Sequence, residues 1–155
     1  MDPNQTRIVL EVLGVADTLN AFAEKFISIL QSDASGPVTD AGKILDGFTV
    51  ERKQGTKDFF LHSALGTLAA RQKLRQNTQG TTPTLSLHYL FVREGQVPDK
   101  DVGVFDFEIC AQGYTSLPAP CDTLHVKLQS ADADSFRRHF FGAVVLANLE
   151  RLPGV

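Results

Sequence analysis

The sequence predicts an α+β fold, because two helical patterns flank a stretch in which apolar and polar residues alternate. Near both ends of the chain, apolar residues recur every three or four positions, which is typical of helices that bury one face. Between them, apolar residues alternate with polar ones in three segments, which is typical of strands with one wet face. With 155 residues, 43% of them hydrophobic, the chain is predicted to form a single domain over residues 1–155.

The first helix is predicted over residues 3–32. Asp2 and Gln5 fit a capping box, with a proline at the first helical position. Several residues of this segment are β-branched, so the alternative is a strand over Arg7–Leu13 followed by a helix over residues 18–32. A continuous seam with heptad spacing favours the single helix. The seam consists of Ile8, Val12, Val15, Leu19, Phe22, Phe26 and Ile29.

A second helix is predicted over residues 58–76. Its apolar face would consist of Leu61, Ala64, Leu65 and Leu68. Three cations near its end would oppose the negative end of the helix dipole, namely Arg71, Lys73 and Arg75. Before this helix, the pattern indicates only a short helical turn at Thr39–Asp46 and a short strand at Phe48–Lys53.

A three-stranded antiparallel meander is predicted next, with the strand at Phe48–Lys53 as a possible fourth strand. Its inward positions are Leu85, Leu87, Tyr89 and Phe91, then Phe105, Phe107 and Ile109, then Leu124, Val126 and Leu128. The simplest loop closures place Phe107 between Tyr89 and Val126.

The last helix is predicted over residues 132–151 and is expected to pack on the sheet. The run over residues 140–147 is apolar on nearly every side, so the helix should contact two neighbours. One neighbour is the sheet, and the other is either the first helix or a partner chain.

The same register places His88, Glu108 and His125 in one row on the opposite face of the meander. Two histidines flanking a carboxylate are a ligand set for zinc or non-haem iron, and they can also perform acid–base chemistry. The alternative is a set of ordinary cross-strand pairs on a solvated face. No phosphate-binding loop, nucleophile elbow or dinucleotide fingerprint is present, so the sequence predicts neither a cofactor nor an enzyme.

The charge of the chain is mild, at −3, which does not indicate a nucleic-acid-binding protein. The basic residues Arg71, Lys73 and Arg75 form a candidate patch, either a solvated face or a contact for an acidic partner. No aromatic residues alternate with them, so nucleic-acid binding is not expected. Cys110 and Cys121 are expected to be reduced thiols of a cytoplasmic protein, and no segment is predicted to enter a membrane.

These observations favour a non-catalytic protein-binding or assembly protein, of the chaperone, inhibitor or structural-subunit type, that acts through apolar helix surfaces. It would bind a protein partner or another copy of itself. The candidate interface residues are Ile8, Val12, Leu19, Phe22, Phe26, Phe140 and Val144. One alternative is a small metal-binding protein or enzyme that uses the row of histidines and Glu108. The other is a small-molecule binder with a pocket lined by Phe105, Phe107, Phe140 and Val144 between the sheet and the last helix.

Overall fold

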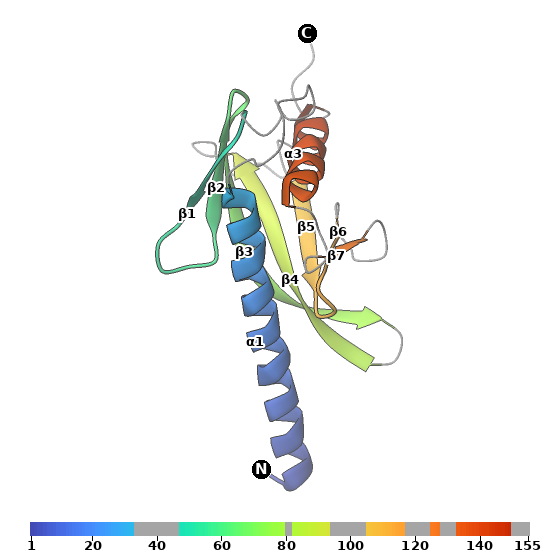
Figure 1. Ribbon diagram of the computed structural model, residues 1–155. Coiled ribbons are helices and arrows are strands. Elements are labelled where there is room, and N and C mark those ends of the chain that lie inside the picture. The colour runs from blue at the N-terminus through green and yellow to red at the C-terminus, as the bar shows by residue number, and fades with distance from the viewer. Residues whose placement is uncertain (33–46, 80–81, 94–104, 117–124, 128–132, 150–155) are drawn as a thin grey trace.

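The computed structural model describes residues 1–32, 47–79, 82–93, 105–116, 125–127 and 133–149, and this part of the chain has an α+β fold (Figure 1). Its strands form one antiparallel sheet in which every strand pairs with its neighbour in sequence, in the order β1-β2-β3-β4-β5-β6-β7. The helices are α1 (Pro3–Gln31) and α3 (Ala133–Leu149). The strands are β1 (Thr49–Arg52), β2 (Phe59–Ser63), β3 (Gly66–Gln79), β4 (Thr82–Arg93), β5 (Phe105–Cys110), β6 (Tyr114–Ser116) and β7 (His125–Lys127).

Helix α1 confirms the single long helix and rules out the strand proposed for Arg7–Leu13. Its capping box forms as expected, because the Asp2 carboxylate accepts a hydrogen bond from the backbone N–H of Gln5 at 2.8 Å. In return, the backbone N–H of Asp2 donates to the side-chain oxygen of Gln5 at 3.0 Å. At the other end, the Ser32 hydroxyl donates to the carbonyl of Ile29 at 2.6 Å and ends the helix.

The second helix predicted over residues 58–76 is wrong, since this segment forms the β2–β3 hairpin. Leu61 and Leu68, seven positions apart, are cross-strand partners whose side chains both enter the core. A spacing that resembles two helical turns therefore arises from a tight turn between two strands. Gly66, with φ +111°, supplies the backbone conformation that follows this turn.

The remaining strands confirm the meander in part. Strand β1 confirms the short strand predicted at Phe48–Lys53, whereas the turn predicted at Thr39–Asp46 lies outside the described residues. Tyr89 pairs with Phe107 as predicted. The predicted contact between Phe107 and Val126 is wrong, because the unpredicted strand β6 lies between β5 and β7 and pairs Thr115 with Val126.

Helix α3 packs on the sheet as predicted, and its second neighbour is helix α1. Both helices cover the same face of the sheet, where their rings meet those of the strands. Phe26 of α1 is the centre of this core and contacts rings of both α3 and the sheet. Its ring centroid lies 4.9 Å from that of Phe107, 5.1 Å from Phe140, 5.6 Å from Phe136, 6.1 Å from Phe59 and 6.3 Å from Tyr89.

Only the C-terminal half of α1 takes part in this core. Its buried residues are Leu19, Ala23, Phe26, Ile27 and Leu30. Residues 1–14 are all exposed, and Figure 1 shows this part of the helix extending beyond the sheet. We call residues 3–18 the free half of α1.

Phe107→Ala should lower the free energy of unfolding by about 3–5 kcal/mol, because it removes a fully buried ring that contacts Phe26, Tyr89 and Phe140. Urea unfolding followed by circular dichroism measures this loss. Leu146→Ala is the matched control and should change stability by no more than about 0.5 kcal/mol, since Leu146 is 63% exposed on α3. A loss below about 1 kcal/mol for Phe107→Ala would contradict the central position of this ring.

Candidate functional site

The free half of α1 carries the largest run of exposed apolar side chains among the described residues. Five of six successive residues are large and apolar, and each is close to half exposed or more. They are Ile8 at 47%, Val9 at 44%, Leu10 at 64%, Val12 at 47% and Leu13 at 56%. A contiguous exposed apolar surface of this kind is typical of a protein contact.

The heptad seam explains why these residues are apolar although nothing in the described chain covers them. Ile8 and Val12 continue, at the same spacing, the seam that Leu19 and Phe26 bury against the sheet. Val15 is half-buried where the helix leaves the sheet. One face of α1 is therefore covered by the protein itself along its C-terminal half and is open along the free half.

The predicted interface residues divide accordingly. Ile8 and Val12 are exposed on the free half. Phe22 is half-buried and its ring lies against the turn at Gly113. The other four are buried in the core, so in this fold they are not accessible to a partner as the sequence suggested: Leu19, Phe26, Phe140 and Val144. They are buried because α1 and α3 cover one face of the sheet together and pack on each other.

The candidate metal row is interrupted by a strand. His88 pairs with Glu108 across β4 and β5, as predicted. Ser116 of β6 then pairs with Glu108, and His125 of β7 pairs with Ser116. His125 is therefore two strands away from Glu108, not beside it as expected.

The side chains of this row also have other partners. Glu108 is buried and accepts a hydrogen bond from the Ser86 hydroxyl. His88 Nε2 lies 3.1 Å from Asp106 Oδ2, so the carboxylate that contacts His88 is that of Asp106. In the part of the chain that the structure describes, no three metal-binding side chains come together. The arrangement resembles ordinary cross-strand pairing more than a metal centre.

The candidate basic patch lies on a strand instead of a helix. Arg71, Lys73 and Arg75 alternate along β3, so all three share the sheet face opposite the helices, where they are exposed. Lys73 pairs with His88 across the sheet. The patch is therefore an exposed row of cations, in which successive side chains are about 7 Å apart.

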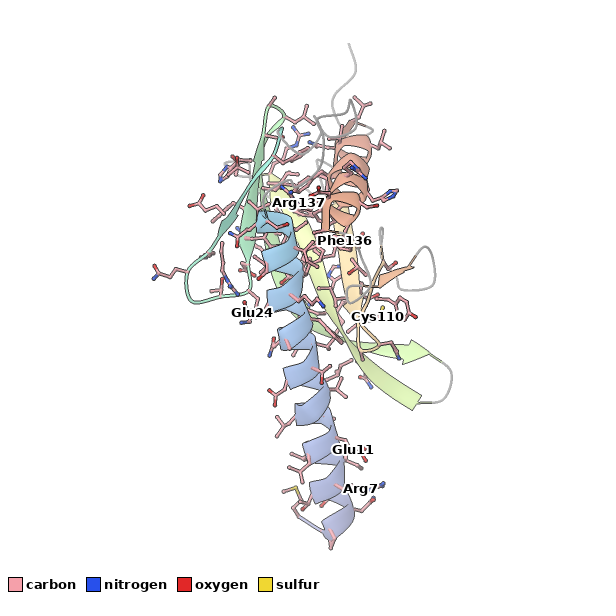
Figure 2. The ribbon with its side chains drawn as sticks, viewed as in Figure 1. Arg7, Glu11, Glu24, Cys110, Phe136 and Arg137 are labelled. Carbon is pink, nitrogen blue, oxygen red and sulfur yellow. The ribbon has the colours of Figure 1, made fainter. Side chains whose placement is uncertain are left out.

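A polar cleft that the sequence did not predict lies where α1 meets the β1–β2 hairpin. The carboxylate of Glu24, which is labelled on α1 in Figure 2, accepts hydrogen bonds from both Arg52 and Lys57. These two bonds lower the pKa of Glu24 to about 2. The carbonyl of Lys57, a residue that lines the cleft, accepts a hydrogen bond from the Tyr89 hydroxyl at 2.8 Å, and burial raises the Tyr89 pKa.

This cleft ties the hairpin to the helix. The backbone N–H of Gln72 donates to the Asp58 carboxylate at 2.9 Å, which fixes the end of the hairpin loop on β3. Both cations that line the cleft are already paired with Glu24. Both cations of the cleft are thus paired with a carboxylate of the same cleft, and we assign the cleft a structural role.

Cys110 is disulfide-bonded, so the expectation that it is a reduced thiol is wrong. Its side chain is buried at the end of β5 (Figure 2). The other cysteine, Cys121, lies outside the described residues.

The chain matches no protein-family model, no curated protein and no solved structure at a significant level. Neither α1 nor α3 has a stretch apolar enough to cross a membrane, and the described residues contain no other helix. On geometry, the free half of α1 is the strongest of the candidate sites, because it has the largest run of exposed apolar side chains in the described part of the chain.

Glu24→Gln should destabilise the protein at pH 7 and have less effect in acid. The carboxylate has a lowered pKa in the folded state, so its contribution is present above the ordinary value of 4.5 and is lost as the pH falls toward about 2. Because these groups are partly exposed, we expect a loss of roughly 1 kcal/mol or less at pH 7.

Urea unfolding of the wild type and of Glu24→Gln, repeated from pH 7 down to the most acid pH at which both fold, measures this difference. Glu11→Gln is the matched control on the same helix and should change stability little, since its pair with Arg7 is exposed. A difference between the wild type and Glu24→Gln that is constant with pH would show that the two ion pairs do not stabilise the fold.

Proposed function

We propose that the protein is a non-catalytic binding or assembly protein whose contact surface is the free half of α1. One observation carries this proposal. Five large apolar side chains between Ile8 and Leu13 are exposed on a helix that extends beyond the sheet (Figure 1). In a monomer in water, this surface is uncovered.

Burial of this surface in a contact with another chain would contribute favourably to the free energy of association. Full burial of one large aliphatic side chain contributes about 1.5–3 kcal/mol, and each of the five is close to half exposed or more. Together they would contribute on the order of 5 kcal/mol. A contribution of that size offsets a large part of the entropy lost on association.

The two alternatives have less support. A metal site would need His88, Glu108 and His125 to converge, and Ser116 lies between the last two in the sheet. A pocket between the sheet and the last helix would need open space beside Phe107 and Phe140. The ring centroids of these two residues lie 5.2 Å apart, so the rings themselves fill that space.

The cellular compartment in which the protein acts is also part of the proposal. The sequence suggested the cytoplasm, where disulfides are rare because thiols are kept reduced. The disulfide at Cys110 favours an oxidising compartment instead.

A photoreactive amino acid at Leu10, in protein produced by its native host, tests the proposal. We expect illumination to yield one adduct of defined mass, because Leu10 is exposed at the centre of the apolar run. Mass spectrometry of the adduct identifies what is bound. The matched control places the same group at Lys25, which is exposed on α1 beside the sheet and should give no adduct. The absence of any adduct at both Leu10 and Leu13 would contradict the proposal.

A further inference from the structure

The free half of α1 is apolar over more of its circumference than one neighbour can cover. Ile8 and Val12 lie in the seam, Val9 and Leu13 lie beside it, and Leu10 lies on the far side. At about 100° per residue, the apolar arc spans about 200°, whereas a helix that packs on one neighbour needs a stripe of about 100°. The free half therefore fits a site in which two surfaces contact it.

The free half also has few local interactions to hold it helical. Its β-branched residues, among them Ile8 and Val9, have lower helix propensity than leucine or alanine. Besides the capping box, its side-chain contacts include a hydrogen bond from Arg7 to Asn4 and an exposed ion pair of Arg7 with Glu11 (Figure 2). Such contacts contribute only about 0.2–0.5 kcal/mol each. A neighbouring surface would stabilise this half far more.

The β3–β4 hairpin lies at the same end of the molecule as the free half (Figure 1), and it carries an exposed leucine. Leu74 of β3 is 45% exposed and pairs with Leu87, which is buried beneath the helices. Paired residues point to the same face of a sheet, so Leu74 lies on the helix-covered face but beyond the helices. Leu85 of β4 is half-buried beside it on the same face.

We propose that the partner of the free half is a second copy of this chain. The two free halves lie antiparallel about a two-fold axis, and the outer side of each contacts the β3–β4 hairpin of the other copy near Leu74. This inference rests on the proposed function and specifies its partner. A two-fold contact is self-complementary, because each copy supplies one helix and receives another on its hairpin.

The register of the helix pair follows from the seam. When Ile8 lies opposite Val12 of the partner subunit, the two-fold axis also places Val12 opposite Ile8 of the partner subunit. Both of these layers of the helix pair consist of apolar residues. Val9 then lies close to Val9 of the partner subunit. Glu11 flanks the seam on the side away from Val9, with Arg7 behind it, so both lie at the water-exposed edge of the helix pair.

The area of such a contact approaches what a stable dimer needs. The 16 residues of the free half form a rod about 24 Å long and about 10 Å wide, with a side surface of about 750 Å². Contact along a single stripe would bury only about 200 Å² per copy. Burial of an arc of about 200° over the whole rod removes about 420 Å², and the hairpin surface that receives the other helix adds about 200 Å², which brings each copy to about 600 Å². Stable interfaces bury about 800 Å² per partner.

Analytical ultracentrifugation of the full chain over a range of protein concentrations tests the inference. We expect a reversible monomer–dimer equilibrium. Ile8→Lys combined with Val12→Lys should raise the dimer dissociation constant by about 100-fold or more, because unpaired charges are strongly penalised in an apolar contact. Lysine has a higher helix propensity than isoleucine or valine, so loss of the dimer would not reflect loss of the helix. Circular dichroism checks that both proteins have the same helix content.

Ala21→Lys combined with Ser28→Lys is the matched control. It adds the same charge at exposed positions of α1 outside the free half and away from the seam, and the dimer should persist. Leu74→Asp should weaken the dimer about 10-fold or more; an unchanged dissociation constant would overturn the hairpin contact. A monomeric wild type, or a dimer that persists in the double lysine variant, would overturn the inference as a whole. A monomeric wild type whose Leu10 still cross-links to a different protein would leave the proposed function intact.

Discussion

The packing of Phe26 against the stacked rings of Tyr89 and Phe107 is the contact on which the rest of the structure depends. Tyr89 and Phe107 pair across β4 and β5, with ring centroids 4.8 Å apart and nearly parallel planes. Phe26 lies on this stack and also meets the edge of Phe140, so one side chain joins α1, the sheet and α3. Edge-to-face and offset ring pairs of this kind stabilise a core beyond the area that they bury.

This anchor divides α1 into two halves with opposite environments. From Leu19 onward, the seam is buried by the sheet and α3, and the ion pairs of Glu24 hold the β1–β2 hairpin to the same part of the helix. Before Val15, the same seam continues with no covering surface in the described chain. A helix anchored at one end and exposed at the other presents an apolar face at its exposed end. The proposed binding surface is in this sense a continuation of the core.

The sequence predicted the features that depend on local spacing. The heptad seam and the Asp2–Gln5 capping box determine α1, and the pairing of Tyr89 with Phe107 follows from alternation. The β2–β3 hairpin was missed because Leu61 and Leu68, as cross-strand partners, reproduce a helical spacing. Strand β6 has only three residues and too short a pattern to detect, and its insertion separates Glu108 from His125.

The sequence predicted only in part which residues of the α1 seam are exposed, for a similar reason. Spacing shows that Ile8, Val12, Leu19 and Phe26 share one helix face, but not where along the helix the sheet ends. That boundary depends on tertiary packing, which no local pattern reports. The same limit applies to Phe140 and Val144, which are buried in a core where α1 packs on α3.

Hydrogen exchange of the α1 amides, measured at low and at high protein concentration, tests the division of this helix most directly. The account predicts that amides in residues 19–31 exchange slowly at both concentrations, because they open only when the core does. Amides in residues 7–18 should exchange fast in dilute protein and become protected as the concentration rises. Equal protection of both halves in dilute protein, or protection of residues 7–18 that does not rise with concentration, would contradict the account.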